Sequence, residues 1–376
     1  MSTLPFNRPL RTGGEAERVA AALDRGWTGG NGPSSEHCQG LLRALTGTHG
    51  VLLTHSCTGA LEMSALLADV GPGDEVILPS FTFASTANAF VLRGATPVFV
   101  DVDPDTLNID PARAADAICD RTRLVVAVHY GGVGCDMAAL GQLCCEHDLL
   151  LVEDAAQAIG ATLDGRALGA IGALGTLSFH ETKNISCGEG GALLVNDERF
   201  AERAEILQEK GTNRQRFARG EVDHYTWVDV GSSFLMSDVT AALLAEQLER
   251  VGEITAARLE IWEAYHAAFE SFEQAGVLRR PVVPEGARHN AHLYRLMLAD
   301  RAARDRVIET LAAAGIAAYF HYVPLHSAPA GRRFGRVHGP MAVTDAAAEQ
   351  LVRLPLWVGI TPGDVARVVQ GVAAAT

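Results

Sequence analysis

Lysine is nearly absent from this chain of 376 residues: of its 31 basic residues, only Lys183 and Lys210 are lysines. Arginine supplies almost every positive charge, so a retained lysine marks a position where a guanidinium group does not suffice. Arginine stays protonated and forms no imine, whereas a primary amine with a lowered pKa forms one readily. The count alone supports equally well a surface lysine that survives by chance.

Several further absences exclude whole classes of protein. The seven cysteines form an odd number and contain no Cys-x-x-Cys pair, so neither a zinc site nor a disulfide framework is predicted. No apolar run approaches the length of a membrane span. The first nine residues lack the apolar core of a secretion signal. We therefore expect a cytoplasmic protein with no metal and no membrane partner.

The charge balance limits the partners that the chain can bind. The formal net charge is −14, which argues against non-specific binding of nucleic acid or an anionic membrane. A single small anionic substrate in a local basic pocket remains compatible with this charge. A hydrophobic content of 48% is sufficient for a substantial core, and the length suits one large and one smaller domain.

Strand-like and helix-like segments alternate between residues 50 and 209. The expected strands are residues 50–54, 74–78, 96–102, 123–129, 149–152 and 190–195. The expected helices are residues 56–68, 83–93, 110–119, 136–147 and 199–209. This alternation predicts right-handed crossovers and an α/β fold with a mostly parallel central sheet and helices on both faces.

The last third of the chain has a different pattern. Residues 237–271 form a long alanine-rich stretch without proline, which predicts a helix that links two domains. Shorter expected strands follow at residues 277–283, 292–298 and 318–322, with helices at 304–314, 346–352 and 362–374. We expect a large domain over residues 1–245, including an N-terminal arm, and a small α+β domain over residues 246–376.

Three segments with chemically useful side chains fall at the expected carboxyl ends of strands, where open parallel sheets bind ligands. Ser56, Cys57 and Thr58 begin a helix whose free N–H groups suit a phosphate, although an ordinary helix cap explains them too. Asp154 directly follows an apolar strand and either pairs with a cationic ring nitrogen or caps a helix. Lys183 lies in the next strand-turn unit.

Taken together, these three segments supply what pyridoxal 5′-phosphate (PLP) requires: an amine, a carboxylate for the pyridinium nitrogen and donors for the phosphate. Ser178, five residues before Lys183, adds a further phosphate donor. Phe83 could stack on the cofactor ring, or it could be a core aromatic residue. Their joint occurrence in this order favours a PLP site over three unrelated helix caps.

The chain also resembles a known family, the fold-type I, PLP-dependent aminotransferases of the DegT/StrS class, which act on nucleotide-linked keto sugars. Within that class it resembles in particular the bacterial dTDP-4-amino-4,6-dideoxygalactose transaminases, which share its FHETKN (179–184) and FHYxPLH (320–326) patterns. The resemblance covers nearly the whole chain and is carried by residues 5–9 (PFNRP), 72–76 (PGDEV), 79–88 (PSFTFASTAN), 99–102 (FVDV), 128–131 (VHYG), 152–157 (VEDAAQ), 178–184 (SFHETKN) and 324–326 (PLH).

The resemblance implies a role for each matching residue. Lys183 forms the imine with the cofactor aldehyde, Asp154 faces the ring nitrogen, and Gln157 contacts the ring hydroxyl. The phosphate is held by Cys57, Thr58 and Ser178, and Phe83 covers the ring. The sugar-nucleotide pocket is lined by His180, His321 and Tyr322; a structural role for each of these three remains open.

One stretch departs from the common family pattern. Many members have Gly-Tyr-Asn-Tyr-Arg-Met, whose asparagine reaches the phosphate of the neighbouring subunit's cofactor, and here residues 231–236 read GSSFLM. Ser233 takes the place of that asparagine, which puts the contact between subunits in doubt. The subgroup named above shares the serine pair. The fold type implies a homodimer at least, with each site at the subunit interface.

The implied reaction is a ping-pong transfer of an amino group from L-glutamate to C4 of a dTDP-4-keto-6-deoxyhexose, in the galacto or the gluco configuration. Cations for the diphosphate are expected in the segment Lys210, Arg214 and Arg219, which could equally be a solvated basic turn. Transfer to C3, or to another nucleotide keto sugar, is the alternative within the family.

Other classes agree less well with the sequence. A nicotinamide-dependent oxidoreductase needs a G-x-G-x-x-G after its first strand, and none is present there. A sugar 3-dehydratase of the same fold has histidine in place of Lys183. A non-catalytic regulator built on this fold is compatible with the motifs.

Overall fold

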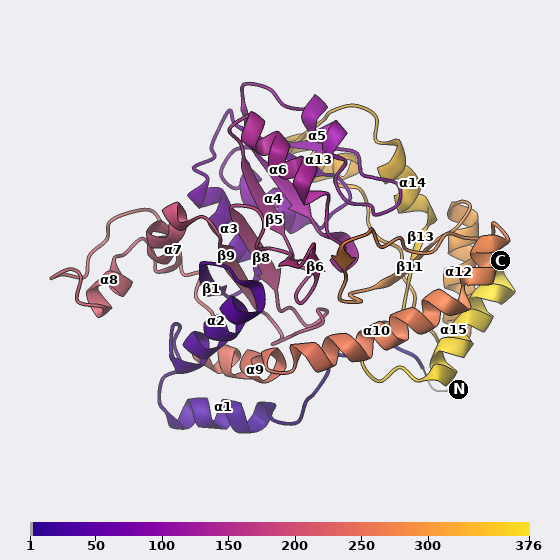
Figure 1. Ribbon diagram of the computed structural model, residues 1–376, viewed down its shortest axis with the longest axis horizontal. Coiled ribbons are helices and arrows are strands. Elements are labelled where there is room, and N and C mark those ends of the chain that lie inside the picture. The colour runs from indigo at the N-terminus through magenta and orange to yellow at the C-terminus, as the bar shows by residue number, and fades with distance from the viewer. Residues whose placement is uncertain (1–2) are drawn as a thin grey trace.

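The computed structural model describes residues 3–376 and is built around one eight-stranded sheet (Figure 1). The strands stand in the order β1 (Gly50–Thr54), β9 (Gly191–Val195), β8 (Leu174–Ser178), β5 (Leu150–Asp154), β4 (Thr122–Val128), β2 (Glu75–Pro79), β3 (Thr96–Val100) and β12 (Arg336–Val337). Only β9 runs antiparallel to its neighbours, β1 and β8; the other pairs are parallel. The expected mostly parallel sheet is therefore confirmed.

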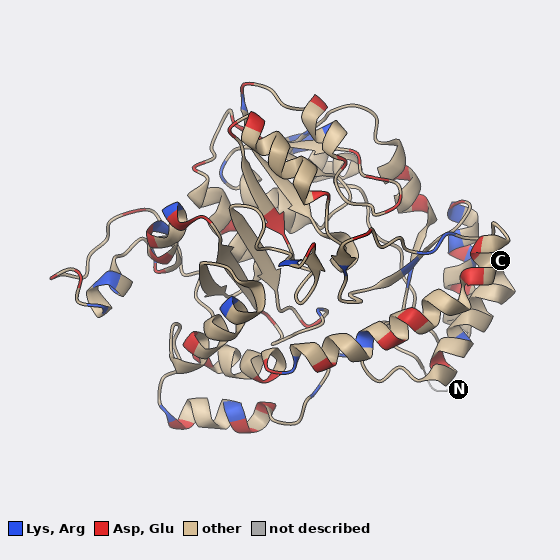
Figure 2. Cartoon of the chain, in the orientation of Figure 1, with Lys and Arg blue, Asp and Glu red and all other residues tan. Residues whose placement is uncertain are grey.

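Helices cover both faces of this sheet, and β4 shows why. Leu124 and Val126 of β4 pack in one core with α3 (Cys57–Leu67), α4 (Ala84–Val91) and α7 (Ala201–Gln208). Val125 and Ala127 pack in the opposite core with α5 (Pro111–Asp116) and α6 (Met137–Glu146). Alternate side chains of a strand point to opposite faces, so a continuous apolar run serves two cores. In Figure 2 the central strands carry little charge.

A third core lies at the β1 end of the sheet. It packs α2 (Pro33–Thr46) and α9 (Asp238–Leu248) against β1, β8 and β9, and α1 (Glu15–Asp24) lies against α9. Helix α2 is not among the helices expected from the sequence, and it begins at Pro33 directly after Gly32. Proline is well suited to the first turn of a helix, where α2 places it.

The segment between residues 198 and 274 contains most of the remaining helices. After a short turn at η2 (Glu198–Phe200), the chain forms α7, then α8 (Arg214–Ala218), which projects from the body at the left of Figure 1. The expected single helix over 237–271 is divided into α9, α10 (Val251–Ala268) and α11 (Glu270–Gln274). Of these, α10 is the long helix that runs from α9, below the large sheet, to α12 (Arg301–Ala313) and α15 (Pro362–Ala375) in the C-terminal third (Figure 1).

The C-terminal third has a core of its own. It combines α10, α12, α15 and the antiparallel pair β11 (Tyr294–Met297) and β13 (Leu351–Leu354). The other elements there are β10 (Ala287–Arg288), η3 (Leu325–Ser327), α13 (Pro329–Phe334) and α14 (Ala342–Gln350). β10 joins β6 (Thr162–Leu163) and β7 (Arg166–Ala167) in a small sheet, and η1 (Tyr130–Gly132) follows β4.

Three local expectations for this third are wrong. Residues 277–283 and 318–322 form single β-bridges, at Arg279 and Tyr319, where strands were expected. The helix expected over 346–352 ends at residue 350, and Leu351 begins β13 instead. The alanine-rich start of that segment favours a helix, but pairing with β11 determines its end.

The two sequence-defined domains are tied together by β12. This strand comes from the C-terminal third but pairs in parallel with β3 of the large sheet. Its Arg336 donates to the buried carboxylate of Glu75 on β2, with Nη2–Oε2 at 2.6 Å. Division of the chain near residue 245, in the last turn of α9, stays a prediction. Within residues 3–376 no helix combines the length and apolar character needed to span a membrane.

Candidate active site

A cavity of about 640 Å³ opens at the carboxyl ends of the parallel strands. Residues that directly follow β1, β2, β5 and β8 line one side of it, as the sequence predicted for a ligand site in such a sheet. The C-terminal third lines the other side. The predicted residues that line the cavity are Ser56, Cys57, Thr58, Phe83, Asp154, Gln157, Ser178, His180, Lys183, His321 and Tyr322.

Lys183 lies in a tight loop between β8 and β9. The loop is closed by hydrogen bonds from the N–H of Lys183 to the carbonyl of His180 (2.9 Å) and from the N–H of Glu181 to the carbonyl of Gly188 (2.8 Å). Within the described residues, the Lys183 amine has no hydrogen bond and no ion pair. Burial lowers the pKa of this amine, and it outweighs the opposing effect of Cys57 and Asp154; the positive charge of Arg353 adds to the lowering. A neutral amine is the nucleophilic form.

Asp154 ends β5 and is almost fully buried. Its Oδ2 accepts from the Thr86 hydroxyl at 2.7 Å, and its Oδ1 accepts from the N–H of Ala156 at 3.2 Å. No lysine, arginine or histidine of residues 3–376 forms an ion pair with it. A buried carboxylate without a counter-ion, facing a cavity, is suited to a cationic ligand group.

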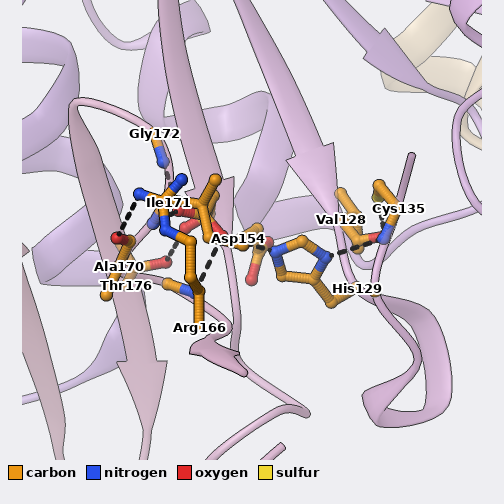
Figure 3. Close-up of polar contacts among 12 residues, drawn as sticks. Val128, His129, Cys135, Asp154, Arg166, Ala170, Ile171, Gly172 and Thr176 are labelled. Carbon is orange, nitrogen blue, oxygen red and sulfur yellow. Dashed lines mark hydrogen bonds and ion pairs between the residues drawn. The ribbon is translucent and has the colours of Figure 1, made fainter. Parts of the chain in front are cut away.

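Glu153, the residue before Asp154, anchors the end of β5 by hydrogen bonds to the surrounding loops. Figure 3 shows His129, Ile171 and Gly172 around this end of the strand. Glu153 is fully buried and accepts from the Nε2 of His129 at 2.8 Å and from the N–H groups of Gly169, Ile171 and Gly172 at 2.6–2.8 Å. Burial acts to raise the pKa of Glu153, but these hydrogen bonds outweigh it and lower the pKa.

His129 completes this anchor. Its Nδ1 accepts from the N–H of Cys135 at 3.1 Å, so the ring bridges β5 to the loop after β4. With β5 fixed in this way, alternation along the strand directs the Asp154 carboxylate into the cavity.

The N-terminus of α3 forms another part of the cavity. The Ser56 hydroxyl accepts from the N–H of Gly59 at 3.1 Å and thereby caps the helix. The N–H groups of Cys57 and Thr58 have no acceptor among the described residues. Strand β9 passes so close that a Cβ on Gly191 would lie 2.4 Å from the Cys57 nitrogen. Free N–H groups at the start of an eleven-residue helix suit a phosphate.

The remaining predicted residues surround the opening. Gln157 is held in place: its Oε1 accepts from the N–H of Gly131 at 2.7 Å, and its Nε2 donates to the Tyr322 hydroxyl at 2.9 Å. The Phe83 side chain is 64% exposed beside the cavity. His321 contacts the Tyr130 hydroxyl at 3.1 Å, and burial lowers the pKa of its imidazole.

Four predicted residues lie outside the cavity of this chain: Ser233, Lys210, Arg214 and Arg219. Arg219 is ion-paired with Glu205 and Glu221 on the projecting segment, and Lys210 lies 3.9 Å from Glu209. In this chain these cations are therefore not available to a ligand of the same cavity.

Sequence reasoning missed several residues that line the cavity. Thr86 and Asn7 lie within the motifs at 79–88 and 5–9, but no chemical role was assigned to them. His292 and Arg353 lie in the C-terminal third and meet Lys183 only through the fold. In the sequence, Arg353 is the single charged residue in the apolar run 351–356 (LVRLPL), and this was the pattern that could have marked it as a candidate site residue.

The residues around the cavity fit PLP. The unpaired Asp154 carboxylate suits a pyridinium nitrogen, the unpaired Lys183 amine suits the aldehyde, and the free N–H groups of Cys57 and Thr58 suit the phosphate. The Ser178 hydroxyl adds a donor near that phosphate position. Each group that the cofactor needs is present, and neither Asp154 nor Lys183 forms an ion pair within the described chain.

Comparisons with known proteins agree with this reading. A family model described as the DegT/DnrJ/EryC1/StrS aminotransferase family matches residues 11–373. The spore coat polysaccharide biosynthesis protein SpsC of Bacillus subtilis is 34% identical over 377 residues, covering 98% of this chain and 96% of SpsC.

Several solved structures also resemble this chain over its whole length. Spr1654 from Streptococcus pneumoniae, in its PLP form, superimposes with a TM-score of 0.91 at 28% identity, covering 100% of this chain and 98% of that one. DesI, solved in the presence of its TDP-sugar product, gives a TM-score of 0.89 at 30% identity, covering 100% and 94%. The expected fold type I, the PLP cofactor and the class of sugar aminotransferases are thereby confirmed. The chain belongs to the DegT/DnrJ/EryC1/StrS family of PLP-dependent aminotransferases.

Proposed function

We propose that this enzyme moves the amino group of L-glutamate to C4 of a dTDP-linked 4-keto-6-deoxyhexose. The observation that carries the proposal is the convergence of Lys183, Asp154 and the free N-terminus of α3 on one cavity. Two further facts support the substrate: the FHETKN and FHYxPLH patterns, and the similarity to DesI, which was solved with a TDP-sugar.

The reaction that we propose has two halves. L-Glutamate gives up its amino group and leaves as 2-oxoglutarate, and the keto sugar then accepts that amino group. When bound, PLP supplies an aldehyde that takes the amino group and a ring that accepts an electron pair from the substrate carbon. Lys183 attaches the cofactor and, once displaced, carries the proton between the substrate carbon and the cofactor.

The other residues of the cavity hold the cofactor and orient the sugar nucleotide. Asp154 keeps the ring nitrogen protonated, and Thr86 fixes the carboxylate. Cys57, Thr58 and Ser178 hold the phosphate, Gln157 the ring hydroxyl, and Phe83 covers the ring. His180, His321 and Tyr322 contact the sugar nucleotide. Burial lowers the pKa of His321 and raises that of the Tyr322 hydroxyl, so we expect both to be neutral in the reaction.

We also propose a homodimer. The projecting segment around α8 exposes Tyr225, Trp227 and Val228, and the Trp227 side chain is 77% exposed. Isolated apolar side chains are common on surfaces, but several on one projecting segment favour a protein partner. A second copy of the chain would also give Lys210, Arg214 and Ser233 a ligand site to contribute to.

Product analysis tests the proposal most directly. Purified enzyme with PLP, L-glutamate and dTDP-4-keto-6-deoxyglucose should give a product whose NMR spectrum has the amino group on C4, with one 2-oxoglutarate formed for each amine. An amine on C3 would refute the position that we assign. No transfer to any nucleotide keto sugar would favour a non-catalytic regulator.

A further inference from the structure

Tyr130 is a buried residue whose hydroxyl has a single hydrogen-bond partner among the described residues. It begins η1, directly after β4, and its side chain does not line the cavity. Its N–H donates to the Oδ1 of Asn108 at 2.9 Å, and its ring packs edge-on against the fully buried Phe81, with 5.2 Å between centroids. The hydroxyl lies 3.1 Å from the Nδ1 of His321. Tyr130 is therefore held in place behind a residue that does line the cavity.

The direction of this hydrogen bond follows from what each partner can satisfy. Burial raises the pKa of the Tyr130 hydroxyl to about 12, so the hydroxyl keeps its hydrogen. If the hydroxyl accepted from His321, that hydrogen would be buried without an acceptor among residues 3–376. Buried donors without a partner are rare in native proteins. The hydroxyl therefore donates, and Nδ1 of His321 accepts.

This bond fixes the tautomer of His321. Burial lowers the pKa of the imidazole, and the charges of Arg353 and Lys183 lower it further, so the ring is neutral. A neutral imidazole carries one N–H, and with Nδ1 as the acceptor this N–H is at Nε2.

Nε2 of His321 is open to a ligand. It has no hydrogen-bond partner within residues 3–376, yet it is not among the atoms of that range that are both buried and unpaired. The two nitrogens of an imidazole point in widely different directions. Because Nδ1 faces the buried Tyr130 and the ring lines the cavity, Nε2–H is a donor that a molecule in the cavity can reach.

The chemistry of the substrate decides which oxygen suits this donor. The charge of Lys183 acts on His321, so the ring lies near the reacting end of the site. In the proposed reaction, the oxygen on C4 of the sugar gains hydrogen and leaves as water. A neutral imidazole with a lowered pKa holds its N–H instead of taking part in proton transfer, so it suits an oxygen that stays on the sugar. The 3-hydroxyl stays, and it is attached to the carbon next to C4.

We infer that Tyr130 is a positioning residue: its hydroxyl donates to Nδ1 of His321 and thereby presents Nε2–H to the 3-hydroxyl of the keto sugar. This inference rests on the proposed function and adds a group that the enzyme recognises beside the reacting carbon. L-Glutamate has no such hydroxyl, so the pair makes this contact only in the second half of the reaction.

Nitrogen NMR of the holoenzyme, labelled with ¹⁵N in its histidine rings, measures the tautomer without any substrate. The signals of His321 are those missing from the spectrum of His321→Gln. We expect a protonated Nε2 and an unprotonated Nδ1 in the wild type. In Tyr130→Phe, the Nδ1 signal should shift because this nitrogen loses its donor. A proton on Nδ1 in the wild type would overturn the inference.

Kinetics of the two half-reactions measure the effect on catalysis. Tyr130→Phe should lower kcat/KM for the keto sugar about 5- to 10-fold, the effect of one neutral hydrogen bond, and change the half-reaction with L-glutamate less than about 3-fold. His321→Gln, with an amide N–H near the position of Nε2, should retain more activity than His321→Asn, whose shorter amide reaches only the position of Nδ1. Tyr294→Phe is the matched control, since it removes a buried hydroxyl that has no partner among the described residues.

A keto sugar nucleotide without the 3-hydroxyl identifies the contact. The wild type should use this analogue at least about 10-fold less well than the normal sugar, and Tyr130→Phe and His321→Asn should discriminate less. Cofactor content and thermal unfolding identify a variant that has lost its fold; if Tyr130→Phe is such a variant, His321→Asn decides.

Two kinetic results would also overturn the inference. Equal use of the two sugars by the wild type removes the contact with the 3-hydroxyl. An equal loss in both half-reactions of folded Tyr130→Phe gives Tyr130 a structural role only. If the wild type aminates no keto sugar although Nε2 of His321 is protonated, the proposed function has failed and the tautomer assignment stands.

Discussion

Thr86 lies fully buried between two partners, and its hydroxyl decides how Asp154 is presented. It donates to Asp154 at 2.7 Å and contacts the Thr82 hydroxyl at 2.8 Å. A carboxylate held by a hydroxyl and a backbone N–H keeps one orientation without a permanent positive partner. The negative charge of Asp154 is therefore available to the ring nitrogen of the cofactor. The protonation state of that nitrogen depends on Asp154 and on Thr86, which orients the carboxylate.

Substitutions of Asp154 and Thr86 should distinguish the effect of the carboxylate's charge from the effect of its orientation. Asp154→Asn should lower turnover about 100-fold or more, because the ring loses the charge that keeps its nitrogen protonated. Thr86→Val should lower turnover about 10-fold, the effect of one lost hydrogen bond. Thr82→Val, which touches Thr86 but not Asp154, is the matched control. Steady-state kinetics with cofactor content measures all three; unchanged turnover in Asp154→Asn refutes the pairing with the ring nitrogen.

At the scale of elements, β12 is held to the large sheet by a charge cluster as well as by backbone pairing. The buried Glu75 carboxylate receives Arg336 of β12 at 2.6 Å and Arg121 at 2.6 Å. The hydrogen bonds from Arg336, against the effect of burial, lower the pKa of Glu75 to about 2. Glu75 begins β2, so this cluster lies at the end of the strand away from the cavity.

The sign of the resulting pH dependence follows from that pKa. The folded value of about 2 lies below the ordinary 4.5 of an unfolded chain, so ionised Glu75 stabilises the fold above about pH 4.5. This contribution declines as the pH falls from about 4.5 toward 2. Glu75→Gln should cost about 2 kcal/mol or more of unfolding free energy at pH 7 and lose part of the decline below pH 4.5.

Urea unfolding between pH 7 and pH 3, followed by circular dichroism, measures both effects. Glu36→Gln, on the exposed side of α2, is the control for loss of one surface carboxylate. Identical pH profiles for Glu75→Gln and the wild type would contradict the assigned role of the cluster.

The elements that could be predicted are those determined by local pattern. β4 and β5 are apolar runs bounded by polar residues, Asp154 ends β5, and Lys183 lies in the loop that follows β8, so both the sheet and the centre of the site could be predicted from the sequence. Arg353 could not, because nothing near it in sequence identifies its neighbour Lys183. The segment 318–322 looks like a strand but makes only one bridge, since tertiary pairing decides which extended segments join a sheet.

At the scale of the whole molecule, the projecting segment around α8 is the feature that a single chain leaves unexplained. It presents Trp227 and Tyr225 to solvent, whereas the sheet and the cavity are complete without it. The wild-type protein should have a solution mass of twice the 39.8 kDa chain. Trp227→Glu should shift the protein toward the monomer and lower activity in parallel, because the charge cannot be buried in an apolar interface.

Light scattering coupled to size-exclusion chromatography measures the mass, and Leu23→Glu, at another exposed apolar position, is the control. A wild-type monomer with full activity would contradict the proposed dimer.

The central claim is that one nitrogen, the Lys183 amine, is bonded to the PLP aldehyde in the resting enzyme. Borohydride reduction of the native holoenzyme, followed by peptide mass analysis, tests it directly, since Lys210 is the only other lysine side chain of the sequence. The predicted result is a stable cofactor adduct on the peptide that contains Lys183, and no adduct in Lys183→Arg. An adduct on the Lys210 peptide, or none at all in enzyme that transfers amino groups, would contradict the claim.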